Sequence, residues 1–291
     1  MLNEQKLYSA DHVINAITVD VEDYYQVSAF AKNIEKNNWS DYESRVERNT
    51  HKLLEIFDQY NTKGTFFVLG WIAERFPNLI NDIQQSGHEI ASHGYSHDLV
   101  YNQTVAEFRE ETRRTKEILE NIINKPIYGY RAASYSIVEK SIWALDVLTE
   151  LGFTYDSSIF PIVHDRYGIP GAKTEPHVYK TESGNSIIEF PISTVGLGNT
   201  RLPISGGGYF RLLPYWVTRS GLNKINKKEK KPFIFYMHPW EIDTGQPRIK
   251  SNMLSEFRHY NNISKFDQRL RKLLQDFKFS TVSDVLERNG F

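Results

Sequence analysis

The sequence predicts an α/β fold, with a (β/α) barrel as its architecture. Short apolar runs alternate with helix-patterned segments about every 25 to 30 residues, which is typical of parallel strands joined by helices. About seven such units in a single chain of 291 residues favour a barrel over an open doubly wound sheet, which remains the alternative. The G-x-G-x-x-G loop that a dinucleotide-binding open sheet would carry is missing.

The expected strands are short and rich in β-branched and aromatic residues. They fall at residues 16–19, 64–70, 88–92, 126–130, 152–156, 187–191, 232–237 and 278–282.

The expected helices are segments in which apolar residues recur at helical spacing. They fall at residues 45–60, 72–87, 104–123, 140–152, 264–277 and 283–289. Pro77 interrupts the second helix and Gly87 ends it, because proline and glycine rarely sit inside helices. Thr104 is expected to cap the third helix at its N-terminus, and Gly152 is expected to end the fourth.

Composition excludes several classes of function. The formal net charge is −1, so the chain carries no basic field that would recruit nucleic acid. Cysteine is absent, which rules out disulfides, thiolate metal sites and a cysteine nucleophile. No apolar run is long enough to cross a membrane, and the N-terminus lacks the pattern of a signal peptide. We therefore expect a soluble, cytoplasmic protein, with the basic stretch 223–231 exposed as a loop or helix end.

Polar side chains follow the expected strands at the point where each strand ends. In a parallel barrel the active site is built at this end from several strands at once, so we expect these side chains to lie close together. The residues concerned are Asp20, Glu22, Asp23, His93, His97, Arg131, Asp156 and His238.

The stretch HEIASHGYSH, residues 88–97, holds three of the nine histidines. Two imidazoles and one carboxylate commonly bind a divalent ion such as Zn²⁺ and leave a position open for water. His93 and His97 would face the same way if residues 93–97 formed a helical turn. The two histidines could instead be ordinary turn residues, but the acidic cluster at another strand end favours a metal site.

Five stretches resemble, in order, the motifs of the polysaccharide deacetylases with the NodB homology domain, carbohydrate esterase family 4. They are TVDVED, SHGYSH, YRAASYS, YDSS and YMH, and the resemblance runs from about Ala16 to Phe291. The stretches VDVEDYYQVSAF, GGGYFRLLP, HPWEID and FRHY further resemble the subgroup associated with bacterial exopolysaccharide and exosortase gene clusters. The resemblance implies a distorted (β/α) barrel with seven strands, of the NodB type. It also implies a single domain over residues 1–291, with about 241–291 as a subgroup-specific extension packed on the barrel.

The resemblance also implies a metal-dependent N-deacetylase and a role for each motif residue. Asp20 would be the general base, Arg131 would orient it, His238 would be the general acid, Asp156 would tune His238, and His93 and His97 would be metal ligands.

The chain departs from the family pattern at two positions. Val21 stands where the family has a second adjacent aspartate, so the metal carboxylate must be Glu22 or Asp23. Strand alternation puts Asp20 and Glu22 on the same side and favours Glu22, although a bend at the strand end could bring in Asp23. Ala133 stands where the family has proline, which would loosen the substrate groove without removing any chemical group.

The resemblance implies an N-acetylated glycan as substrate, with Tyr135, Tyr209 and Trp240 as candidate sugar-binding side chains. Zn²⁺ is the expected metal, with Co²⁺, Ni²⁺ and Mn²⁺ as alternatives. Two other functions fit the same barrel: an amidohydrolase acting on a small ureide or cyclic imide, and a catalytically inactive glycan-binding protein. The sequence indicates no oligomeric state.

Overall fold

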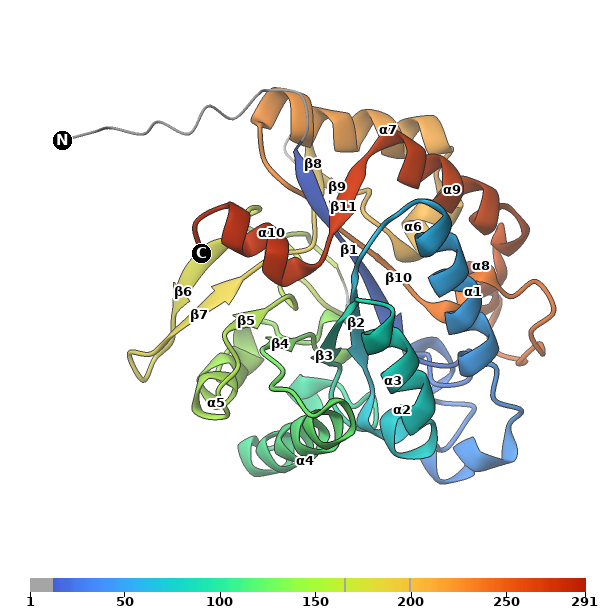
Figure 1. Ribbon diagram of the computed structural model, residues 1–291, viewed down its shortest axis with the longest axis vertical. Coiled ribbons are helices and arrows are strands. Elements are labelled where there is room, and N and C mark those ends of the chain that lie inside the picture. The colour runs from blue at the N-terminus through green and yellow to red at the C-terminus, as the bar shows by residue number, and fades with distance from the viewer. Residues whose placement is uncertain (1–12, 165, 199) are drawn as a thin grey trace.

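The computed structural model describes residues 13–164, 166–198 and 200–291 of the chain (Figure 1). Its strands are β1 (Ile14–Val21), β2 (Thr65–Val68), β3 (Glu89–Ser92), β4 (Gly129–Tyr130), β5 (Tyr155–Asp156), β6 (His177–Lys180), β7 (Ser186–Glu189), β8 (Thr194–Leu197), β9 (Thr200–Pro203), β10 (Ile234–Met237) and β11 (Lys278–Ser280).

Its α-helices are α1 (Val46–Gln59), α2 (Gly70–Arg75), α3 (Pro77–Gln85), α4 (Val105–Ile123), α5 (Ala144–Glu150), α6 (Gly207–Leu212), α7 (Tyr215–Asn223), α8 (Met253–Tyr260), α9 (Phe266–Asp276) and α10 (Val282–Arg288). Shorter helical turns that matter for the site are η1 (Ser28–Phe30), η4 (Ala133–Tyr135), η7 (Pro239–Ile242) and η8 (Ile263–Lys265).

The main sheet has the strand order β10-β1-β2-β3-β4-β5-β7-β6. All pairs along this order are parallel except β6 with β7, so seven strands run in one direction. Strand β11 adds to the first half of β1, also in parallel. Figure 1 shows the helices arranged around the outside of these strands. The predicted βα architecture is therefore confirmed.

Side-chain and loop hydrogen bonds connect the two ends of the parallel sheet. The Ile234 N–H in β10 donates to Ser193 Oγ at 3.0 Å, and the Tyr236 N–H donates to the carbonyl of Ser205 at 2.9 Å. Ser205 Oγ in turn donates to the carbonyl of Ser193 at 2.7 Å. Because Ser193 follows β7 in the chain, these bonds connect β10 to the segment after β7 without a regular β-ladder.

Most element boundaries follow the sequence pattern. Thr104 caps α4 as expected, accepting from the Glu107 N–H while the Glu107 carboxylate accepts from the Thr104 N–H. The expected helix 72–87 is two helices, because Pro77 lacks the N–H that a continuous helix needs and instead begins α3. The stretch 223–231, expected to be an exposed loop or helix end, contains a π-helical turn with Ile225 and Asn226 buried.

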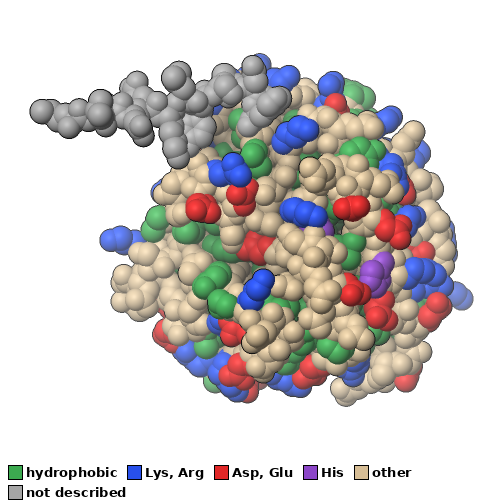
Figure 2. Space-filling view, in the orientation of Figure 1, with side chains coloured by type: hydrophobic (Ala, Val, Ile, Leu, Met, Phe, Trp, Pro, Cys, Tyr) green, Lys and Arg blue, Asp and Glu red, His purple; other side chains and the backbone are tan. Residues whose placement is uncertain are grey.

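The surface is mixed in charge. Figure 2 shows Lys and Arg side chains interspersed with Asp and Glu over the face it presents. Among the described residues, no helix is long and apolar enough to span a bilayer. Residues 241–291 lie against the barrel, with β11 on β1 and α10 packed beside it. The assignment of this segment as a subgroup-specific extension stays a prediction.

Gly206 is a position where only glycine fits, and it tests the connection between the sheet ends. Its φ is +138°, and a Cβ at this position would lie 2.0 Å from the carbonyl oxygen of Tyr236. We expect Gly206→Ala to lower the free energy of unfolding by about 2 to 3 kcal/mol, because backbone in β10 must move. Urea denaturation measures the change.

Gly196→Ala is the matched control, because Gly196 is exposed and has open space around its Cβ direction. It should change the free energy of unfolding by less than about 0.5 kcal/mol. Equal losses for the two variants would contradict the assigned close approach of Gly206 to β10.

Candidate active site

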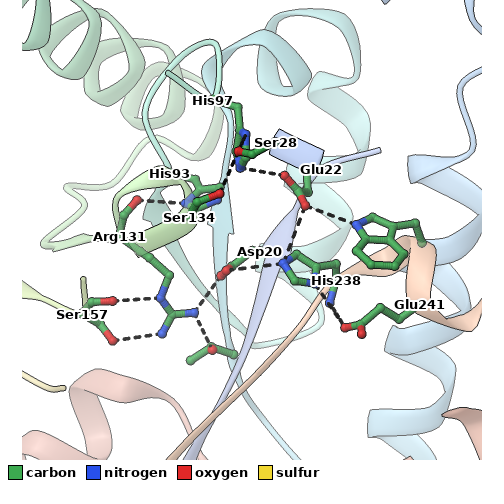
Figure 3. Close-up of polar contacts among 12 residues, drawn as sticks. Asp20, Glu22, Ser28, His93, His97, Arg131, Ser134, Ser157, His238 and Glu241 are labelled. Carbon is green, nitrogen blue, oxygen red and sulfur yellow. Dashed lines mark hydrogen bonds and ion pairs between the residues drawn. The ribbon is translucent and has the colours of Figure 1, made fainter. Parts of the chain in front are cut away.

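Most of the predicted site residues converge at the carboxyl ends of the strands (Figure 3). Asp20 and Glu22 lie at the end of β1, His93 and His97 follow β3, and His238 follows β10. All five line one pocket with a volume of about 430 Å³. Side chains along its rim are exposed, among them Leu254 and Phe257 of α8, so the pocket opens to solvent.

Glu22, His93 and His97 form a cluster suited to a metal ion. Each offers one ligand atom, and these atoms lie within 4.8 Å of one another. All three side chains are buried, and Glu22 Oε2 lies 2.9 Å from His97 Nε2. Two imidazoles and one carboxylate match the donor set of open divalent metal sites, so the residues present fit the ion that the resemblance implies.

His93 is held ready to act as a ligand. Its Nδ1–H donates to the carbonyl oxygen of Arg131 at 2.9 Å, which leaves the lone pair of Nε2 for a metal. Burial lowers the pKa of His93 to about 4, so the ring is neutral at physiological pH. The hydroxyl of Ser28 lies 3.4 Å from His97 Nδ1 and supports the second ligand more weakly.

The segment 93–97 brings its histidines together without a helical turn, contrary to expectation. Gly94 and His97 both have left-handed backbones, with φ of +73° and +55°. The carbonyl of Gly94 accepts from the N–H of Gly70 at 2.9 Å, at the start of α2. A tight non-helical loop, held by the free N–H groups of a helix, therefore sets the two rings 5.5 Å apart.

Asp23 lies outside the cluster and serves a structural purpose. Its Oδ2 accepts from Ser44 Oγ at 2.8 Å and from the N–H groups of Arg45 and Val46 at 2.7 and 3.1 Å. These donors are at the N-terminus of α1, where unpaired N–H groups and the helix dipole favour a carboxylate. Of the two carboxylates considered for the metal, the geometry favours Glu22.

Arg131 lies behind the pocket and holds Asp20. Its side chain is completely buried, and Nη1 donates to Asp20 Oδ1 at 2.7 Å and to Thr18 Oγ1 at 2.7 Å. The remaining donors reach the carbonyl and the hydroxyl of Ser157 at 3.1 and 3.0 Å. A guanidinium with all its edges occupied fixes the Asp20 carboxylate in one orientation.

His238 stands beside both carboxylates of β1. Its Nε2 lies 3.6 Å from Glu22 Oε1 and 4.0 Å from Asp20 Oδ2, while Nδ1 lies 3.1 Å from Glu241 Oε2. Burial alone would lower the pKa of His238, but the hydrogen bond to Glu241 and the charge of Glu22 outweigh it and raise the pKa to about 9.

Asp156 is not the carboxylate that contacts His238. Its side chain accepts from the hydroxyl and the N–H of Ser158 at 2.6 and 3.1 Å, beside the buried Glu189. Burial raises the pKa of Glu189 well above its usual range, and the charge of Asp156 adds to this, so Glu189 keeps its proton. The carboxylate against His238 is Glu241, which the sequence reasoning missed although it lies three residues later in the stretch HPWE.

The three aromatic candidates all line the pocket but differ in exposure. Trp240 is buried, stacks on His238, and donates from Nε1 to Glu22 Oε1 at 3.2 Å. Tyr135 is also buried, with its ring against Tyr236. Tyr209 is the partly exposed member of the set and is the best placed to meet a ligand.

Comparison with known families divides the chain in two. Residues 31–155 match the polysaccharide deacetylase family, and residues 157–287 match a domain of unknown function, DUF3473. Asp20 and Glu22 precede the first match, whereas His238 and Glu241 lie within the second. The pocket is therefore assembled from both regions and from the strand before them.

Two curated relatives are similar over part of their length. A peptidoglycan-N-acetylglucosamine deacetylase from Bacillus cereus is 38% identical over 86 residues, covering 28% of this chain and 31% of the relative. A peptidoglycan deacetylase from Helicobacter pylori is 30% identical over 108 residues, covering 37% of this chain and 36% of the relative. The chain thus spans about a third of the length of the relatives it matches.

A solved structure agrees over nearly the whole chain. The crystal structure of a putative polysaccharide deacetylase from Mycobacterium smegmatis superposes with a TM-score of 0.62 at 20% identity, covering 96% of this chain and 91% of that one. At this identity the likeness shows the fold alone, and it confirms the barrel.

The structural assignment of Asp23 can be tested by its removal. Asp23→Ala should lower the free energy of unfolding by about 1 to 2 kcal/mol, because the first N–H groups of α1 lose their acceptor. Metal binding should be unchanged. Urea denaturation and a metal titration measure the two effects, with Glu43→Ala as an exposed acidic control. A loss of metal binding in Asp23→Ala would instead identify Asp23 as a metal ligand.

Proposed function

We propose that the chain is a metal-dependent hydrolase that removes N-acetyl groups from the amino sugars of a bacterial polysaccharide or its precursor, because residues 31–155 match the polysaccharide deacetylase family. One observation carries this proposal: Asp20 and His238 lie beside the Glu22–His93–His97 cluster in a single pocket. Amide hydrolysis needs a base to activate water and an acid to protonate the leaving amine, and both sit here beside candidate metal ligands.

Glu22, His93 and His97 would hold the metal, most naturally Zn²⁺, with Co²⁺, Ni²⁺ or Mn²⁺ as alternatives. When bound, such an ion supplies a Lewis acid that polarises the acetyl carbonyl and makes water more acidic. The fixed tautomer of His93 and the burial of all three side chains support this assignment.

Asp20 is proposed as the general base. Its Oδ1 is tied to Arg131, so Oδ2 remains to accept a proton from the attacking water. His238 is proposed as the general acid, because Nδ1 is turned to Glu241 and Nε2 to the pocket. Water adds its oxygen to the acetyl carbon, the C–N bond breaks, and the nitrogen takes a proton from His238. The products are acetate and a free amino sugar.

A backbone N–H in residues 132–134 is proposed to help stabilise the tetrahedral oxyanion. The N–H of Ala132 is already donated to Ser158 Oγ at 2.8 Å, so it is not that donor. Ser134 lines the pocket in η4 with a left-handed φ of +50°, and its hydroxyl contacts Ser28 Oγ at 2.7 Å. Strained backbone of this kind is often held in place for function, so we assign the donor to the Ser134 N–H.

The glycan would enter from the solvent side of the pocket. Tyr209, partly exposed, is proposed to stack on a sugar ring. Trp240 and Tyr135 are buried and are proposed to act as walls that hold the reacting groups in position.

The experiment that tests this function measures acetate released from a panel of N-acetylglucosamine oligosaccharides. We expect release by the Zn²⁺-loaded protein, loss of release with a chelator, and recovery when Zn²⁺, Co²⁺, Ni²⁺ or Mn²⁺ is added back. Hydrolysis of a small ureide or cyclic imide with no acetate from any glycan would favour the amidohydrolase. Glycan binding without hydrolysis would favour an inactive binding protein.

The role of Asp20 predicts a separation of chemistry from metal binding. Asp20→Asn should lower kcat by about 10²- to 10⁴-fold, because the base is lost while the Arg131 contact can persist through the amide oxygen. Bound metal, measured by elemental analysis, should match the unmodified protein. Full metal-dependent activity in this variant would rule Asp20 out as the base.

A further inference from the structure

The contacts of His238 continue away from the pocket into the region of unknown function. Both the backbone N–H and the ring Nδ1 of His238 contact one oxygen of Glu241, at 3.0 and 3.1 Å. Glu241 lies in η7 and its side chain is completely buried. Because a carboxylate oxygen only accepts, Nδ1 must carry a hydrogen.

The second oxygen of Glu241 is held by a buried arginine. Arg211, at the end of α6, donates from Nε to Glu241 Oε1 at 2.6 Å, and only 2% of its surface is exposed. The two carboxylate oxygens are therefore divided between an imidazole and a guanidinium. Burial raises the pKa of Glu241, but Arg211 and His238 outweigh it and hold the pKa below its usual range.

Arg211 is itself fixed by the end of α8. Its terminal nitrogens donate to the carbonyl oxygens of Arg258, His259 and Asn261. The guanidinium also lies 5.1 Å from the ring centre of Trp240, the residue that stacks on His238. Because each of its three guanidinium nitrogens donates to an oxygen, Arg211 is held in one orientation and in turn holds Glu241.

We propose that Glu241 and Arg211 are positioning residues that fix the ring orientation and proton placement of His238, so that Nε2 faces the substrate nitrogen. This inference rests on the proposed function, in which His238 is the acid. It gives the DUF3473 region a defined role, because this region supplies the acid together with the two residues that aim it. It also assigns to Glu241 the contact with His238 that was expected of Asp156.

The same contacts would exist if the pair merely joined η7 to α8. The two roles differ in what happens to the proton on Nδ1. In Glu241→Gln, the amide oxygen can serve only one side, because Arg211 Nε–H and the His238 backbone N–H both only donate. The charged guanidinium binds that oxygen more strongly than a neutral N–H does, so we expect the amide NH₂ to turn toward His238. Nδ1 must then give up its hydrogen, and the ring carries its proton on Nε2 in the neutral form. A purely structural pair would have no such effect on catalysis.

The first experiment compares steady-state kinetics of Zn²⁺-loaded variants on an N-acetylglucosamine oligosaccharide. Glu241→Gln should lower kcat by about 10- to 100-fold, with KM and bound Zn²⁺ within about threefold of the unmodified protein. Arg211→Met should lower kcat by a similar factor. Arg211→Lys should show a smaller loss, because a cation remains beside Glu241.

Asp243→Asn is the matched control. Asp243 lies two residues after Glu241 and is also ion-paired with arginines, to Arg45 at 3.2 Å and Arg48 at 2.9 Å, but these hold it against α1. This variant should keep kcat within about twofold, since it removes a buried ion pair without touching His238. Equal falls in kcat for Asp243→Asn and Glu241→Gln would overturn the proposal.

The second experiment reads proton placement directly, by ¹⁵N NMR of histidine-labelled, Zn²⁺-loaded protein. The Nδ1 resonance of His238 should be that of a protonated nitrogen in the unmodified protein and in Asp243→Asn, and of an unprotonated nitrogen in Glu241→Gln. A protonated Nδ1 in Glu241→Gln, with kcat within about twofold of the unmodified protein, would overturn the proposal. If the unmodified protein releases no acetate from any glycan, the proposed function fails, and the NMR result alone decides whether the pair sets the proton of His238.

Discussion

The site depends on the burial of three carboxylates that cannot be left unpaired. A charge removed from water must be neutralised or hydrogen-bonded, and each of the three has its own solution here. Asp20 is held by Arg131, and Glu241 is held by Arg211. Glu22 is paired with neither of these arginines. It lies against imidazoles, which is the environment expected of a carboxylate that shares a cation with them.

Much of the fold could be predicted because it follows from short-range patterns of apolar and polar residues. The alternation of strand-like and helix-like periodicity predicted the α/β fold class. The polar residues at strand ends indicated where the pocket would form. Parallel strands bring those ends together whatever their separation in the chain, which is why residues as distant as Asp20 and His238 could be grouped in advance. Thr104 marked the start of a helix because its hydroxyl can cap the first N–H groups, and Pro77 marked a break in the expected helix 72–87 because it lacks an N–H.

Pairings between side chains could not be predicted in the same way. Asp23 and Glu22 are neighbours in sequence, yet one caps a helix that begins at Val46 and the other meets the histidines. Strand alternation favoured Glu22 for the metal, but the partners of Asp23 depend on how the chain leaves β1, which no residue pattern encodes. Glu241 was missed for a related reason: its value as a partner depends on the buried cation of Arg211, thirty residues earlier in the chain.

The pairing of β11 with β1 has a consequence for how the protein is made. The strand that carries Asp20 and Glu22 receives partners from residues 65–68, 234–237 and 278–280. During synthesis, β1 is made long before β10 and β11, its two partners more than 200 residues away, and such long-range pairing is slow to form. Those stretches of β1 stay unpaired until residues 234–237 and 278–280 have been made. A chain cut between α9 and β11 would therefore have a first strand that lacks a partner on half of one edge.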